Sequence, residues 1–298
     1  MIAFPVPGLR SVVVNGATLA YLERGVGGSS VVFVHGGYSD LRTWLRQLDA
    51  FAEEFRAVAY SRRYARPNED IPNGHDDQMG PHVDDLLGLI RSLDLAPVHL
   101  VGNSWGAFIC LLAALREPGL VRTLVLGEPP VLPLFISNSP TFRELLAMLL
   151  RTPRDALSVI AFGARVASPA ENAYRAGDLE RGTRIFVTGV LGSAAFGALP
   201  EERKQQMWEN HTADAAQLLG ADFPPLRESD VRRLQTPALL VTGERSPTIL
   251  RRTLTRRLER LLPNVERVEI AGASHLMHEE NPDGFNRAVL SFFRRRES

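Results

Sequence analysis

The sequence predicts an α/β protein with a mostly parallel, doubly wound sheet and a helical insertion after the sixth strand. Short segments rich in Val and Leu alternate with helical segments along most of the chain. From the third such segment onward they lack the period-two alternation of a half-exposed strand, which is typical of parallel strands buried on both faces. The alternation stops between about residues 129 and 232, where helical patterns follow one another.

The expected elements follow from this pattern in chain order. Strands are expected at Arg10–Val14, Thr18–Leu22, Val31–Val34, Ala57–Tyr60, Val98–Val101, Thr123–Leu126, Ala238–Val241 and Val265–Ile270. Core helices are expected at Leu41–Glu54, Pro81–Leu93, Trp105–Glu117, Pro247–Leu262 and Pro282–Arg294. Inside the insertion, Thr152-Pro153 and Ser168-Pro169 each predict a helix start, because a hydroxyl side chain precedes a proline at the first helical position.

The same pattern divides the chain into two domains. A core domain over residues 1–129 and 232–298 carries the sheet, and a helical cap covers residues 130–231. An insertion at this point forms a lid over the carboxyl ends of the strands, where open α/β sheets bind their ligands. We therefore expect the functional site between the sheet edge and the cap.

The composition excludes several classes of function. The 298 residues include 34 basic and 34 acidic side chains, so no excess charge favours nucleic acid or an anionic membrane. Cys110 is the only cysteine, which excludes an intrachain disulfide and a thiolate metal cluster. No apolar stretch reaches transmembrane length, and the N-terminus lacks the features of a signal peptide. We expect a cytoplasmic protein that binds a small-molecule substrate and needs no cofactor or metal. The sequence leaves open whether the protein forms a homodimer.

Residues 102–106 carry the strongest functional signal. They read Gly-Asn-Ser-Trp-Gly, a G-x-S-x-G motif, after the apolar run Val98–Val101 and before the helical run Ala107–Glu117. A strand-to-helix turn of this kind exposes the serine hydroxyl above the sheet, and the flanking glycines avoid clashes with the strand and the helix. The backbone N–H after the serine, at the helix N-terminus, can stabilise an oxyanion. The motif therefore predicts that Ser104 is a nucleophile.

Two further motifs stand on either side of this turn in the chain. His35-Gly36-Gly37 follows the third expected strand, and Gly272-Ala273-Ser274-His275 follows the last one. With Ser104 between them and the insertion after the sixth strand, the chain resembles the α/β-hydrolase family over nearly its whole length. The resemblance implies an α/β-hydrolase fold and His275 as the catalytic base. It also implies an oxyanion hole made by the backbone N–H groups of Gly37 and Trp105.

The acid of the catalytic triad departs from the family pattern. Most of the family carries an aspartate shortly after the seventh strand, where this chain has Ser246, which cannot supply a charge. Glu128 is the favoured acid, because it directly follows the sixth strand and so lies on the same sheet rim as the nucleophile, within reach of His275. This placement resembles that of zearalenone lactonases and of one type of haloalkane dehalogenase. Glu244 or an incomplete triad are the alternatives, and His278 is the one serious rival for the base.

These residues predict acyl transfer to Ser104 and then to water, in a carboxylic ester hydrolase or lactonase. A serine nucleophile excludes the aspartate-based branches of the family, which are the haloalkane dehalogenases and the ordinary epoxide hydrolases. The apolar residues of the cap suit a medium-sized, mostly neutral substrate, which Tyr38, Trp44 and Trp208 are expected to contact. A C–C bond hydrolase of the meta-cleavage type and a non-catalytic, ligand-binding member of the fold stay open as alternatives.

Overall fold

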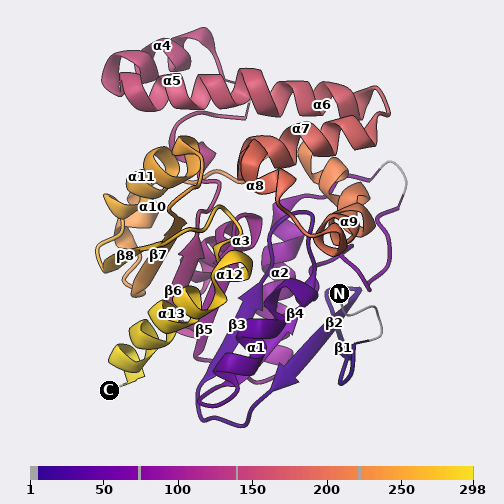
Figure 1. The fold of residues 1–298 in the computed structure, drawn as a ribbon. Helices are drawn as coiled ribbons and strands as arrows, with labels where there is room; N and C mark the ends of the chain where they lie inside the picture. The colour runs from indigo at the N-terminus through magenta and orange to yellow at the C-terminus, as the bar shows by residue number, and fades with distance from the viewer. Residues whose placement is uncertain (1–5, 73–74, 139, 221–222, 298) are drawn as a thin grey trace.

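The computed structural model describes residues 6–72, 75–138, 140–220 and 223–297 (Figure 1). Eight strands within these ranges form one sheet, in the order β1-β2-β4-β3-β5-β6-β7-β8. β2 pairs antiparallel with β1 and β4, and the remaining pairs are parallel. The strands are β1 Arg10–Val14, β2 Ala17–Arg24, β3 Ser30–Val34, β4 Arg56–Tyr60, β5 Val98–Asn103, β6 Val121–Gly127, β7 Ala238–Gly243 and β8 Val265–Ile270. Each expected strand is confirmed, and so is the mostly parallel, doubly wound sheet.

Outside residues 130–227 the described part of the chain forms the five expected helices, one of them altered, and two short helices that were not expected, at Glu228–Arg233 and Met277–Glu280. They are α1 Leu45–Phe51, α2 Met79–Ser92, α3 Trp105–Arg116, α10 Glu228–Arg233, α11 Thr255–Glu259, α12 Met277–Glu280 and α13 Pro282–Glu297. A 3₁₀ turn over Leu41–Trp44 leads into α1. The helix expected over Pro247–Leu262 starts instead as a π-helix, Ile249–Leu254, and continues as α11.

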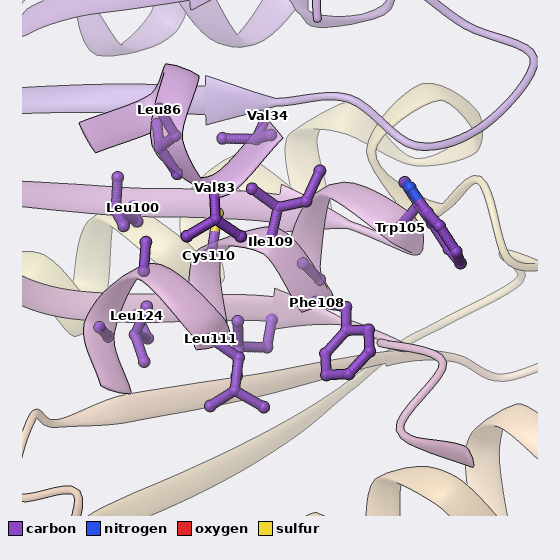
Figure 2. Close-up of a cluster of buried hydrophobic side chains, with 14 of the residues drawn as sticks. Val34, Val83, Leu86, Leu100, Trp105, Phe108, Ile109, Cys110, Leu111 and Leu124 are labelled. Atoms are coloured by element: carbon purple, nitrogen blue, oxygen red, sulfur yellow. The ribbon is translucent and has the colours of Figure 1, made fainter. Parts of the chain in front are cut away.

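Two hydrophobic clusters cover the two faces of the sheet. Side chains alternate between them along each strand, so that Val32 of β3 packs with α2 and α3, and Phe33 packs with α1 and α13. Figure 2 shows part of the first cluster, in which Phe108 and Leu111 of α3 lie beside the sheet. β3 and β5 are buried along their whole length. This double burial is the physical reason why their sequences are continuous apolar runs.

The insertion between β6 and β7 is mainly helical in its described residues. Its helices are α4 Phe142–Arg151, α5 Pro153–Phe162, α6 Ser168–Arg175, α7 Leu179–Leu191, α8 Ser193–Gly197 and α9 Glu201–Leu219. Figure 1 shows α4 to α7 along the top of the view and α9 below them at the right-hand side. Residues that directly follow β3 and β5 share a cavity with residues of α7 and α9, so the insertion covers the carboxyl edge of the sheet.

One of the two expected helix starts in the insertion is wrong. α5 begins at Pro153 as expected, although the Thr152 hydroxyl donates to Met148 O and caps nothing. Ser168 starts no new helix, because a π-turn over Gly163–Ala167 with helical backbone angles joins α5 to α6. None of the described helices combines the length and the apolar character that crossing a bilayer requires.

Candidate active site

Ser104 lies on a strained turn between β5 and α3. Its backbone angles are φ 53° and ψ −122°, a conformation that residues with a side chain rarely adopt. The two flanking glycines make the turn possible, since a Cβ on Gly102 would lie 2.5 Å from Ala107 N and a Cβ on Gly106 would lie 2.2 Å from Val34 O. Sequence and geometry agree here, and the turn presents the serine at the carboxyl edge of the sheet.

Glu128 and His275 form a buried hydrogen-bonded pair at the same edge. His275 Nδ1 lies 2.6 Å from Glu128 Oε2, and the carboxylate is fully buried. The second carboxylate oxygen accepts a hydrogen bond of 3.1 Å from the backbone N–H of Gly243, which fixes its orientation. Glu128 also has a positive φ of 46°, another strained backbone position at this edge. The pair is therefore held rigidly by β6 and β7 on one side and by the loop after β8 on the other.

The other nitrogen of His275 is available for chemistry. His275 Nε2 is buried and has no hydrogen-bond partner among the described residues. His275 and Ser104 both line a cavity of about 50 Å³, which we call the His275 cavity. A buried imidazole with one nitrogen on a carboxylate and the other free beside a serine has the arrangement of a general base.

The rival residues do not form the hydrogen-bonded pair that Glu128 and His275 form. Glu244 is exposed and its carboxylate accepts from Gly272 N at 2.7 Å instead of contacting His275. The hydroxyl of Ser246, in the usual place of the acid, is buried and has no partner within the described chain. His278 is buried against Trp44, with ring centroids 4.0 Å apart, and burial lowers the pKa of His278 to about 4. It is therefore neutral at pH 7, and although it also lines the His275 cavity, its Nε2 lies 3.1 Å from the hydroxyl of Thr43.

Of the three residues expected to contact substrate, one lies at the site. Tyr38 lines the cavities beside Ser104. Trp44 is fully buried in the core between Phe33 and His278, so the expectation that it contacts substrate is corrected. Trp208 lines neither cavity; it is 38% exposed and borders a separate surface depression, so it is corrected as well.

The loop after β3 is held by a buried polar network. His35 Nδ1 donates to Gly36 O at 2.8 Å, while its Nε2 accepts from the backbone N–H of Arg62 at 2.9 Å. Burial and the nearby Arg62 lower the pKa of His35 well below its ordinary value, which keeps the ring neutral. The Arg62 guanidinium also donates to Gly36 O, at 3.1 Å. Since C=O and N–H point in opposite directions across a trans peptide, the Gly37 N–H points away from this network.

The second N–H expected at the oxyanion hole belongs to Trp105. Trp105 is the first residue of α3, so its N–H has no partner inside the helix. The loop with Gly37 packs directly against this turn, since a Cβ on Gly36 would lie 3.1 Å from the Cβ of Ser104. Gly37 and Trp105 therefore both lie close to the serine, as an oxyanion hole requires.

A second, larger cavity also opens onto Ser104. It has a volume of about 130 Å³ and shares Gly37 and Tyr38 with the His275 cavity. Its walls are mostly apolar and come from the loop after β6, the cap and the π-helix; they include Trp105, Leu132, Phe162, Phe186, Phe223 and Leu250. We call it the apolar cavity, and its composition suits a neutral, largely apolar group.

Two functional residues were missed by sequence reasoning. Arg62 is 4% exposed and donates to Gly36 O. Asp214 of α9 is 4% exposed and accepts a hydrogen bond from the backbone N–H of Tyr38. Neither has a local motif, because its partner lies on a segment far away in the chain. The sheet brings the loops after β3 and β4 together and so places Arg62 against Gly36 O, whereas the packing of the cap on the core brings Asp214 to Tyr38.

The comparisons with known proteins identify the family of the chain. The model of the alpha/beta hydrolase family matches residues 31–288, so the chain belongs to this family and is a hydrolase. It is 26% identical to the 2-(acetamidomethylene)succinate hydrolase of Mesorhizobium japonicum, over 95% of this chain and 94% of that protein. It is 25% identical to carboxylesterase YbfK of Bacillus subtilis, over 88% and 79% of the two chains. The solved structure of an enol-lactonase from Burkholderia xenovorans LB400 superposes with a TM-score of 0.72 and 19% identity, covering 96% of this chain and all of that one. The expected fold and family are therefore confirmed, while the likeness to zearalenone lactonases stays a prediction.

Proposed function

We propose that the protein is a serine hydrolase that cleaves a carboxylic ester or lactone of a medium-sized, mostly neutral substrate. In this proposal Ser104 is the nucleophile, His275 the general base and Glu128 the triad acid. The observation that carries it is the 2.6 Å contact between His275 and Glu128, with the free Nε2 in the cavity that Ser104 also lines. The relative from Bacillus subtilis named as a carboxylesterase supports the same class of reaction.

Acylation follows from this arrangement. Ser104 Oγ attacks the carbonyl carbon while His275 Nε2 takes its proton, and the carbonyl electron pair moves onto oxygen. The N–H groups of Gly37 and Trp105 stabilise that oxyanion by hydrogen bonds. Glu128 stabilises the imidazolium and keeps its ring in place. The tetrahedral intermediate then collapses, and His275 gives the proton to the departing alkoxide oxygen.

Deacylation repeats these steps with water as the nucleophile. His275 Nε2 takes a proton from water, whose oxygen attacks the acyl carbon, and the same two N–H groups bind the second oxyanion. Collapse breaks the bond to Ser104 Oγ, which recovers its proton from His275. The products are a carboxylic acid and an alcohol, or one hydroxy acid if the substrate is a lactone.

The test compares wild type, Ser104→Ala, Glu128→Gln and Glu244→Gln on p-nitrophenyl esters of graded acyl length and on a series of lactones. We expect Ser104→Ala to lower kcat about 10⁴-fold or more. Glu128→Gln should lower it about 10²- to 10⁴-fold, because the imidazolium loses its counter-charge. Glu244→Gln is the matched control, and we expect it to leave kcat within about twofold, since it is an exposed substitution away from the buried features that matter.

Three outcomes would contradict parts of this proposal. Turnover that survives in Ser104→Ala would exclude a serine nucleophile. Loss of activity in Glu244→Gln, with activity retained in Glu128→Gln, would make Glu244 the triad acid. If no ester or lactone is turned over although a fluorophosphonate labels Ser104, the C–C hydrolase alternative replaces ester hydrolysis, and cleavage of a vinylogous diketone tests it directly.

A further inference from the structure

A carboxylate from the cap lies directly on the loop that carries Gly37. Asp214 Oδ2, on α9, accepts a hydrogen bond from the backbone N–H of Tyr38. Its other oxygen fills the space above Gly37, where a Cβ would lie 2.7 Å from Asp214 Oδ1. Asp214 also lines the apolar cavity together with Ser104. A residue of the cap thus occupies the place where any side chain on Gly37 would otherwise stand.

The two successive peptide groups of this loop are held by different domains. The core holds the Gly36–Gly37 peptide, because Arg62 and His35 both donate to Gly36 O. The cap holds the next peptide, Gly37–Tyr38, through Asp214. Tyr38 has a positive φ of 53°, a strained conformation that persists only where surrounding contacts impose it. Without the acceptor on α9, the buried N–H of Tyr38 would lack its partner and the peptide could rotate.

We infer that Asp214 is a positioning residue for the oxyanion hole. By accepting the Tyr38 N–H it fixes the Gly37–Tyr38 peptide, and because Arg62 and His35 hold the preceding peptide, Gly37 is fixed on both sides and its N–H keeps facing the oxyanion. The oxyanion hole is then complete only while the cap is seated on the core. This inference rests on the proposed serine hydrolase mechanism and adds a role for the cap within it.

The surroundings of Asp214 indicate that it acts as an acceptor and not as a charge. The cations nearby are Arg62 and Arg203, and Asp77 and the Tyr174 hydroxyl also face it. Burial raises the pKa of Asp214 to about 7, although Arg62 opposes this shift. With a pKa of about 7 the carboxyl is protonated in part at neutral pH, which lessens its repulsion of the oxyanion, and its unprotonated oxygen still accepts the N–H. An amide oxygen in the same place should therefore serve equally well.

The experiment compares Asp214→Ala with Asp214→Asn, and uses Asn210→Ala as the matched control. Asn210 lies one turn earlier on the same face of α9, is equally buried, and bonds the core at Asp40 and at Arg66 N. Each variant is assayed for kcat and KM on the best ester from the test above. Each is also titrated with an alkylboronic acid, whose boron becomes tetrahedral and anionic on Ser104 Oγ as His275 takes the proton.

We expect Asp214→Ala to lower kcat about 10- to 100-fold and to weaken boronate binding by a similar factor, with KM within about threefold. Asp214→Asn and Asn210→Ala should both stay within about threefold of wild type in kcat and boronate affinity, since neither removes the acceptor at Tyr38. If Asp214→Ala does not fold, Gly37→Ala provides the second arm. Its methyl group would displace the carboxylate and should lower kcat and boronate affinity together.

Several results would overturn the inference. An equal loss of kcat and boronate affinity in Asp214→Ala and Asn210→Ala would mean that Asp214 only holds the cap on the core. A rise in KM without a fall in kcat in Asp214→Ala would mean that Asp214 only lines the cavity. If Asp214→Asn lost as much kcat and boronate affinity as Asp214→Ala, the negative charge of Asp214 would be required. Failure of the serine mechanism is distinguishable, because wild type itself would then bind no boronate; if wild type and Asp214→Ala bind it equally, only this inference fails.

Discussion

The core helices and the cap contact the sheet through different chemistry. α3 buries an almost wholly apolar surface, with Phe108, Ile109 and Leu111 packed in the first hydrophobic cluster. α9 of the cap buries a polar stripe against the core. The members of this stripe recur every three or four residues and are all at most 7% exposed; they are Arg203, Gln206, Asn210, Asp214 and Gln217.

The partners of this stripe lie in the loops that surround the nucleophile. Gln206 and Asn210 each donate to the carboxylate of Asp40 at 2.9 Å, and Arg203 donates to Tyr38 O at 2.9 Å. Apolar contacts of the kind made by α3 are non-directional and provide most of the folding free energy. Buried hydrogen bonds add little net stability but cost much when one partner is lost, so they fix one arrangement. The difference indicates that the apolar core provides stability, while the polar stripe fixes how the cap is seated on the core.

The substitution expected to weaken the polar contact between cap and core most strongly is Asp40→Ala. Asp40 is fully buried and accepts from Arg42, Gln206 and Asn210, so the substitution strands several buried donors. We expect the free energy of unfolding to fall by about 3–5 kcal/mol, measured by urea denaturation. Asp70→Ala is the control, because the Asp70–Arg66 pair is solvent-exposed and should contribute less than about 1 kcal/mol. Equal effects of the two substitutions would contradict the role of the polar stripe.

A second test uses pH to separate the two regions. The pKa of Asp214 is raised by burial from 3.8 to about 7, so the folded state binds its proton more tightly than the unfolded state. Its contribution to stability is therefore complete below about pH 4 and is lost as the pH rises towards 7. The free energy of unfolding of Asp214→Asn, relative to that of wild type, should therefore rise by about 4 kcal/mol between pH 4 and pH 8 and stay constant at higher pH. A pH-independent difference between the two proteins would show that Asp214 is ionised throughout.

The contrast between the regions also explains what the sequence could predict. The strands were predictable because burial on both faces demands continuous apolar runs, and the turn at Ser104 because only glycines avoid its clashes. Glu128 could be proposed because the parallel order fixes which strand ends share one edge. These signals are local or follow from topology alone.

The cap could not be predicted in the same way. A polar stripe on a helix looks the same in the sequence whether it faces water or buried partners, so the roles of Asp214 and its neighbours carry no local signal. For Trp44 and Trp208, an aromatic residue near a predicted pocket was interpreted as a contact with substrate. Whether such a ring points into the cavity, into the core or outward depends on helix orientation, which only packing decides.

The smallest expected effects are on steady-state kinetics, and they distinguish the surface of the cap that faces the cavities from its outer surface. Phe186 of α7 lines both cavities beside Ser104, whereas Trp208 of α9 borders only a surface depression. Phe186→Ala removes part of the apolar wall, and we expect KM for an apolar ester to rise about 5- to 30-fold with a smaller change in kcat. Trp208→Ala should leave both constants within about twofold, because the side chain contacts neither cavity. Steady-state kinetics of the two variants on the same ester provide the test. A larger rise in KM for Trp208→Ala than for Phe186→Ala would mean that the substrate binds across the outer face of α9 and not in the apolar cavity.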